Sequence, residues 1–162
     1  SSVSQPGEVI AIRQVAIGPR GGPNVLFTET ANSGQSNSLL RPKTHAVQYP
    51  NIKFDGQVEV DVVPLDDVMS EFPDRADYDF ISIDVQGFEL EALKTGVEQL
   101  KHTKAILAEV NRVEMYEGCC LVRDIEKFLS EHGFEFVRVS WAGVTWGDGL
   151  FVRKDCREEV LF

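Results

Sequence analysis

The sequence has 162 residues, enough for a sizeable core, and we expect residues 1–162 to form a single domain. Its composition, 43% hydrophobic and 26% charged, is that of an ordinary globular protein. The formal net charge is -10 and the isoelectric point is about 4.7. This acidity argues against nucleic acid or an anionic membrane as a partner, because phosphate binding requires a basic surface.

The cysteines and the first residues of the sequence bear on the cellular compartment in which the protein is expected. Cys119, Cys120 and Cys156 are odd in number and two are adjacent, so a disulfide framework is not expected. Residues 1–7 have neither the basic start nor the apolar stretch of a signal peptide, and no apolar run approaches the about 20 residues that span a bilayer. We expect a reducing, cytoplasmic location without membrane contact. The scattered histidines show no zinc-type spacing, and no metal is expected.

The first half of the chain is predicted to form strands and loops. Residues 8–17 and 25–28 are rich in β-branched residues, and the glycine- and proline-rich break between them suggests a hairpin. Residues 31–50 are polar and predict a long surface loop, which is often functional. Valines alternate with acids over residues 58–62, the period of a half-buried strand, and Asp66 can cap a short helix that follows.

The second half alternates short apolar runs with amphipathic stretches. The runs predict strands over residues 80–83, 105–110 and 134–139, and the amphipathic stretches predict helices over residues 87–101 and 121–132. Such alternation implies parallel βαβ units with right-handed crossovers, and hence an α/β fold. A final hairpin, with its turn at Gly147-Asp148-Gly149, predicts an antiparallel end to the sheet.

The strongest candidate for chemistry is the segment Ile83-Asp84-Val85-Gln86-Gly87-Phe88-Glu89. Asp84 comes where a buried strand is predicted to end, and ligands of open α/β sheets bind at the carboxyl ends of the strands. Gly87 lets the backbone approach a ligand or turn tightly. The pattern is equally consistent with Asp84 as a simple helix cap and Glu89 as a solvated acid of the first turn.

Further candidates follow from position. Glu109 ends the next predicted strand and would lie beside Asp84, where paired acids suit proton abstraction, cation binding or hydrogen bonding to a polar cofactor. A charge that merely meets solvent at the rim of the sheet is the alternative. In the polar loop, Ser36 and Ser38 could contact a substrate, as could Trp146 with Asp148 at the final hairpin; a plain turn and core filling explain these residues as well.

The order of these segments resembles the FkbM family of methyltransferases. The segments that carry the resemblance are residues 14–18, 36–40, 63–68, 79–89, 93–96, 106–110, 129–134 and 147–153. The match covers the chain from about Val9 to Lys154, and Asp84 to Glu89 is its most specific part. The resemblance implies a Rossmann-like class I methyltransferase sheet, mostly parallel with an antiparallel C-terminal hairpin. It also implies methyl transfer from S-adenosylmethionine to a hydroxyl of a small molecule or sugar.

The resemblance also implies roles for individual residues. Asp84 would be the base or the acid that orients the acceptor, with Glu109 and Glu89 in support. The cofactor would be bound by Ala16, Ile17, Asp84, Gln86 and Gly87, with Ala16 and Ile17 beside the adenine. The acceptor would be contacted by Ser36, Ser38, Trp146 and Asp148.

The sequence departs from the family pattern in two ways. Ser82 stands where the family usually has a lysine, and Gln86 replaces a glutamate. In addition, the glycine-rich loop that holds the cofactor's methionine end, and the acid that binds its ribose, are not found, so N-terminal strands of the sheet are expected to be missing. One alternative is a truncated or non-catalytic α/β module that forms a homo-oligomer through its open sheet. A carboxylate-based hydrolase that uses Asp84 and Glu109 is another.

Overall fold

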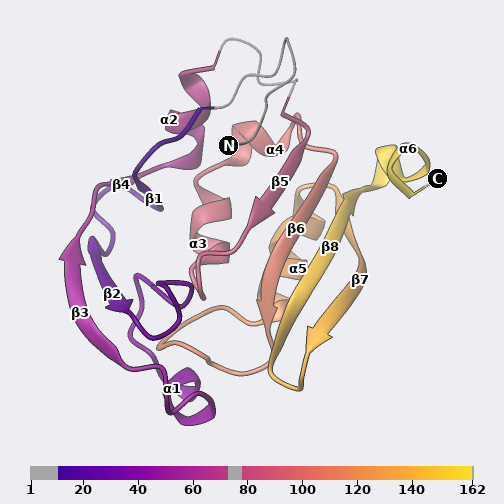
Figure 1. Ribbon diagram of the computed structural model, residues 1–162. Helices are drawn as coiled ribbons and strands as arrows, with labels where there is room; N and C mark the ends of the chain where they lie inside the picture. The colour runs from indigo at the N-terminus through magenta and orange to yellow at the C-terminus, as the bar shows by residue number, and fades with distance from the viewer. Residues whose placement is uncertain (1–10, 73–77, 162) are drawn as a thin grey trace, which may run out of the picture.

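The structure is a computed structural model that describes residues 11–72 and 78–161. Its largest sheet has four strands in the order β5-β6-β8-β7 (Figure 1). β5 (Phe80–Ile83) runs parallel to β6 (Ala105–Asn111), whereas β8 (Trp146–Arg153) is antiparallel to both β6 and β7 (Phe134–Ala142). The α/β fold and its antiparallel C-terminal hairpin are confirmed. The expectation of a mostly parallel sheet is wrong for the described strands, because a tight turn, not a helical crossover, joins β7 to β8.

The turn of this hairpin lies elsewhere than predicted. Gly147 and Gly149 fall inside β8, and the chain reverses at Gly143, whose φ of 78° is left-handed. A Cβ at Gly147 would collide with the backbone of β7, and one at Gly149 would lie 3.1 Å from Phe136. These strand glycines therefore serve close packing, a role that a sequence pattern does not separate from a turn.

The N-terminal part forms two small sheets. β1 (Ala16–Ile17) pairs in parallel with β4 (Val62–Val63), and β2 (Val25–Glu29) pairs antiparallel with β3 (Phe54–Glu59). The predicted hairpin between residues 8–17 and 25–28 is thus wrong in its pairing, and residues 8–10 lie outside the described part. The strand predicted over 58–62 is divided between β3 and β4.

The predicted loop over residues 31–50 is more ordered than expected. It contains α1 (Thr44–Gln48), and it buries Ser36, Ser38, Leu39 and His45. The backbone of Ser38 pairs with Phe27 of β2, which draws the segment against the N-terminal sheets. The polar composition therefore reflects buried, hydrogen-bonded groups and not only a solvated surface.

Short helices connect the strands. The helix predicted over residues 87–101 divides into α3 (Glu89–Lys94) and α4 (Val97–Leu100), and Gly96 between them lies against Leu65 of α2 (Leu65–Ser70). Asp66 does not cap its own helix. Its carboxylate accepts hydrogen bonds from the backbone N–H groups of Glu98 and Gln99, at 2.9 and 2.8 Å, at the start of α4.

The remaining helices follow the sequence prediction more closely. α5 (Val122–Glu131) is followed by Gly133 with φ 88°, the predicted left-handed stop. After β8 come a short 3-10 turn (Lys154–Cys156) and α6 (Arg157–Leu161). No helix in the described part of the chain is long and apolar enough to cross a membrane.

The core lies between the large sheet and the helices α3 and α5; Figure 1 shows α5 behind β6 and β8 and α3 beside the end of β5. Alternate residues of β6, Ile106, Ala108 and Val110, are fully buried there. β5 is an edge strand, and no described strand pairs with its outer edge. Its Phe80 side chain is 54% exposed, so one side of this strand is open.

Candidate active site

The segment that follows β5 is held by a buried acid. Gln86 and Gly87 have φ values of 54° and 95°, so two consecutive residues take the left-handed conformation. Glu89, the first residue of α3, is fully buried, and its Oε1 accepts hydrogen bonds from the N–H groups of Val85 (3.1 Å) and Gly87 (3.0 Å). Glu89 is therefore not a solvated first-turn acid; it fixes the loop that carries Asp84.

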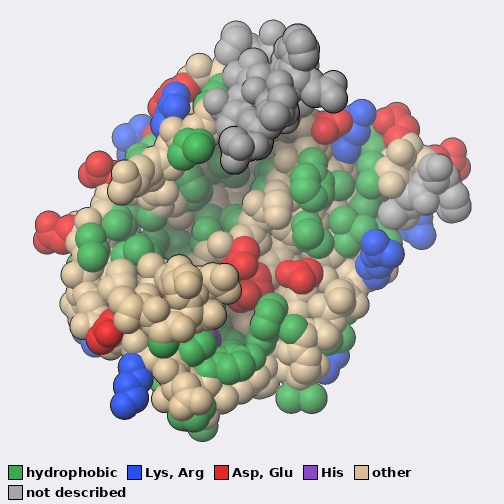
Figure 2. Space-filling model, viewed as in Figure 1, with side chains coloured by type: hydrophobic (Ala, Val, Ile, Leu, Met, Phe, Trp, Pro, Cys, Tyr) green, Lys and Arg blue, Asp and Glu red, His purple; other side chains and the backbone are tan. Residues whose placement is uncertain are grey.

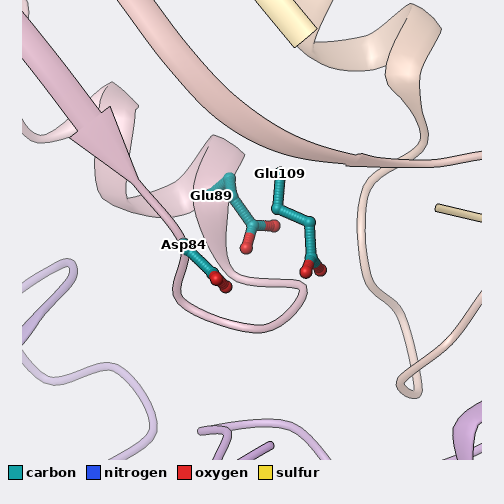
Figure 3. A group of neighbouring side chains, drawn as sticks. All are labelled: Asp84, Glu89 and Glu109. Carbon is teal, nitrogen blue, oxygen red and sulfur yellow. The ribbon is translucent and has the colours of Figure 1, made fainter. Parts of the chain in front are cut away.

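Three carboxylates meet at the ends of β5 and β6. Asp84, Glu89 and Glu109 each offer an oxygen within 4.8 Å of the others, and Figure 3 shows their carboxylates pointing toward a common space. The predicted proximity of Asp84 and Glu109 follows from the parallel register, in which Ile83 lies beside Ala108. Burial, with the neighbouring carboxylates, raises the pKa of Glu109 to about 8. Burial also raises the pKa of Glu89 to about 7.

Gln86 connects two of these acids to a tyrosine. Its Nε2 donates hydrogen bonds to Asp84 Oδ1 at 2.6 Å and to Glu109 Oε2 at 3.0 Å. The hydroxyl of Tyr116 donates to Gln86 Oε1 at 2.7 Å, which orients the amide. Gln86 thus offers donors to two carboxylates, which a glutamate at this position could not do.

A polar cavity of about 530 Å³ opens in front of these acids. Figure 2 shows acidic side chains gathered in the hollow at the centre of this face. The residues that line the cavity are Asn32, Gln35, Ser36, His45, Tyr49, Ile52, Asp84, Gln86, Glu109, Asn111, Met115, Tyr116 and Trp146. Ser36 and Trp146 therefore lie where the sequence predicted substrate contacts. Asp148 is exposed on β8 opposite Glu109, and it is not among these lining residues.

A second, more apolar cavity of about 490 Å³ lies between the N-terminal sheets and the end of β5. Ala16 and Ile17 line it together with Val85 and Asp84, so these predicted cofactor residues share one cavity. Asp84 lines both cavities, which places it at their junction. Of these two cavities, Gln86 lines only the polar one. Gly87 lines a third, smaller hollow together with Cys119.

The predicted substrate residue Ser38 lies beside the apolar cavity and not the polar one. Its hydroxyl donates to the carbonyl oxygen of Gln86 at 2.7 Å and accepts from the N–H of Leu40 at 3.0 Å. The first hydrogen bond joins the segment before α1 to the loop after β5, and the second lies within the segment before α1. This hydroxyl is therefore engaged within the protein.

The sequence did not single out several residues of the polar cavity. His45 is buried among the rings of Tyr49, Phe54 and Tyr116, with centroids 5.0 to 5.5 Å away, and burial lowers its pKa. Asn111 is buried two residues beyond Glu109 on β6, and this strand period was the signal that could have found it. No comparable signal marked His45, whose burial also depends on the distant Tyr116.

Comparisons with known proteins identify the family of the chain. The Methyltransferase FkbM domain matches residues 6–136. The 2-O-methyltransferase NoeI of Sinorhizobium fredii (strain NBRC 101917 / NGR234) is 34% identical over 151 residues, covering 90% of this chain and 60% of that protein. The chain therefore belongs to the FkbM family of methyltransferases, as the sequence resemblance predicted. It spans 60% of the length of this curated relative.

One solved structure shows a weaker likeness. It is magnesium protoporphyrin IX methyltransferase from Synechocystis PCC 6803 with bound S-adenosylmethionine. The identity is 19%, the TM-score is 0.37, and the match covers 59% of this chain and 47% of that one. A likeness of this size carries no argument about the present chain.

Proposed function

We propose that this chain provides the acceptor side and part of the cofactor site of an S-adenosylmethionine-dependent O-methyltransferase. The observation that carries the proposal is the position of Asp84 at the junction of an apolar and a polar cavity. Methyl transfer requires a donor and an acceptor that meet in line, and the protein contributes mainly by positioning them. The name of the relative NoeI, a 2-O-methyltransferase, supports transfer to a hydroxyl.

The apolar cavity is suited to the nucleoside end of the cofactor. Its volume of about 490 Å³ lies within the usual range for small-molecule sites, and Ala16 and Ile17 offer apolar contacts for an adenine ring. Asp84 would lie toward the acceptor, with Gln86 and Gly87 shaping the loop beside it. When bound, S-adenosylmethionine supplies an electrophilic methyl group on a sulfonium sulfur.

The same proposal includes the architecture of the large sheet. The order β5-β6-β8-β7 would be one half of a Rossmann-like sheet, and further strands would pair with the open edge of β5. Those strands would carry the glycine-rich loop that the methionine end requires. A cytoplasmic location stays a prediction from the sequence.

The polar cavity would bind the acceptor. It is walled by Trp146 and Tyr49, and none of its lining residues is a lysine or arginine, which favours an uncharged hydroxyl compound such as a small molecule or sugar. Burial raises the pKa of Glu109 to about 8, so Glu109 would gain the charge needed to accept the hydroxyl proton only as the pH rises toward that value, and Asp84 beside it would be the base or the acid that orients the acceptor. Glu89 lines neither cavity and would act as a positioning residue through the loop.

The test is a pair of measurements. Calorimetric titration of the purified chain should show binding of S-adenosylmethionine through its nucleoside end. In a protein that also holds the strands proposed to carry the glycine-rich loop, transfer of a labelled methyl group to hydroxyl compounds should be lost in Asp84→Asn without loss of the fold. Asp155→Asn, which alters an exposed acid in the turn after β8 and lines neither cavity, serves as the matched control. Full transfer activity in Asp84→Asn would refute the role of Asp84.

The open edge of β5 favours a second candidate, a non-catalytic module that assembles through this strand. An edge strand with a half-exposed phenylalanine is a template for pairing with another chain. Sedimentation would then show a homo-oligomer, and calorimetry would show no cofactor binding. A monomer that binds the cofactor would exclude this candidate.

A further inference from the structure

The acidic cluster behind the polar cavity, formed by Asp84, Glu89 and Glu109, has no cationic partner among the described residues that line the cavity. Glu89 Oε1 accepts hydrogen bonds from the backbone of the loop after β5. Glu89 Oε2 is buried and has no hydrogen-bond partner among the described residues. A buried carboxylate oxygen without a partner is costly, and such atoms call for an explanation. Asn111 Oδ1, buried at the wall of the same cavity, is a second such atom.

We propose that Asp84, Glu89 and Glu109 bind one divalent cation of the Mg²⁺ or Mn²⁺ type. The available ligands are all oxygens, which these hard cations prefer. Ligands on opposite sides of such an ion, at about 2.1 Å each, lie about 4.2 Å apart. Oxygens that already lie within 4.8 Å of one another therefore need only small side-chain adjustments.

Gln86 explains how the cluster is stable without the ion. Its Nε2 lies between Asp84 and Glu109 and donates to both, which takes the place of a positive charge. The single proton of the Tyr116 hydroxyl has two acceptors within reach, Gln86 Oε1 at 2.7 Å and Ser36 O at 3.1 Å, so one acceptor is left over. In the absence of the ion, the Tyr116 hydroxyl therefore cannot donate to both oxygens at once.

Rotation of the Gln86 amide by half a turn gives Gln86, the Tyr116 hydroxyl and the Ser36 carbonyl each a partner once a cation is bound. Oε1 then faces the acids as a further oxygen ligand, and Nε2 donates to the Tyr116 hydroxyl. The Tyr116 proton is released for Ser36 O. The amide and the ion are thus alternative partners of the same carboxylates.

The open side of the ion would face the polar cavity, because Asp84 is exposed there while Glu89 closes the opposite side. If the proposed function holds, an acceptor hydroxyl would enter that coordination position, where the ion would lower the pKa of the hydroxyl. The binding of the ion itself does not depend on that function.

Titration of the wild-type chain with Mn²⁺ alone, followed by the electron paramagnetic resonance of the free ion, tests the proposal. We expect one saturable site per chain. Glu89→Gln and Glu109→Gln should each weaken binding by about tenfold or more. Glu89→Gln keeps an oxygen that can accept from the loop, and circular dichroism checks that both variants fold. Glu126→Gln, an exposed acid of α5, is the matched control and should bind as the wild type does.

A fourth carboxylate gives an independent test. Gln86→Glu should bind Mn²⁺ more tightly than the wild type, and its Tm should rise more on addition of Mn²⁺. Without the ion this variant should melt lower, because the donated hydrogen bonds are replaced by repulsion.

Three outcomes would overturn the proposal: no saturable binding at millimolar Mn²⁺, equal weakening by Glu126→Gln, or unchanged binding in both Glu89→Gln and Glu109→Gln. Calorimetry with S-adenosylmethionine separates this result from the proposed function. Mn²⁺ binding without cofactor binding keeps the cation site and removes the methyltransferase proposal, and the reverse result removes only the cation site.

Discussion

The hydroxyl of Ser38 lies 2.7 Å from the carbonyl oxygen of Gln86, although the two residues are 48 positions apart in the chain. This hydrogen bond joins the segment before α1 to the loop that carries Asp84. Gln86 has a positive φ, so its carbonyl is presented by a backbone conformation that few residues other than glycine adopt. The shape of the acidic site therefore depends on Ser38, which belongs to neither β5 nor β6.

We predict that Ser38→Ala lowers the free energy of unfolding by about 1 to 3 kcal/mol, because it leaves the partly buried Gln86 carbonyl and Leu40 N–H without the Ser38 hydroxyl as a partner. Urea denaturation of the two proteins measures the difference. Ser130→Ala, at an exposed position of α5, should change stability little. A loss no larger than that of Ser130→Ala would contradict the prediction.

Gly87→Ala is expected to destabilise the fold more than Gly118→Ala. Both glycines have positive φ, 95° and 72°, and share the cost of strain, about 1 to 3 kcal/mol. A Cβ at Gly87 would also lie 2.9 Å from Cys119 Cβ, whereas one at Gly118 has no neighbour within 4 Å. Thermal denaturation of the pair isolates the steric contribution, and equal Tm losses would show that Cys119 moves aside.

His45 should make stability depend on pH. Burial lowers its pKa from the ordinary 6.5, so below that value the unfolded chain binds a proton that the folded chain resists. The contribution of the uncharged His45 to the free energy of unfolding is then complete above pH 6.5. It is lost as the pH falls toward the lower pKa that His45 has in the folded protein. The difference in unfolding free energy between wild type and His45→Phe should shrink over this range. A difference that stays constant between about pH 5 and 8 would exclude the effect.

Trp146→Phe should weaken acceptor binding if the proposed function is correct. The indole Nε1 donates to the Tyr49 hydroxyl at 2.9 Å, and both side chains line the polar cavity. We expect a severalfold higher KM for the acceptor and an unchanged Kd for S-adenosylmethionine. Trp141→Phe, a tryptophan of β7 that does not line this cavity, is the control, and an equal effect of both changes would argue against a specific contact.

The acidic site was predictable from the sequence because it depends on local rules. Asp84 and Glu109 each stand at the end of an apolar run, and parallel neighbours place their ends together. Gly133 was likewise predictable as the end of α5, since a helix stop needs only one left-handed residue.

Pairing between distant segments could not be predicted in the same way. The β-branched run at β1 indicates a strand but not its partner, which is β4 rather than β2. Asp66 has the composition of a cap for α2, yet tertiary packing brings it to the backbone of Gln99 in α4. Periodicity describes one element at a time, and these contacts depend on which elements meet.

The separation of the sheets has a consequence for motion. β6 is hydrogen-bonded on both sides and its inward residues are fully buried, whereas β2 and β3 form a two-stranded ribbon that shares no ladder with it. Amide hydrogen exchange should therefore be slowest in β6 and markedly faster in β2 and β3. The apolar cavity, which Leu26 and Thr28 of β2 and Val58 of β3 line, then has the more mobile wall, whereas Glu109 in the wall of the polar cavity is held by the firmly paired β6.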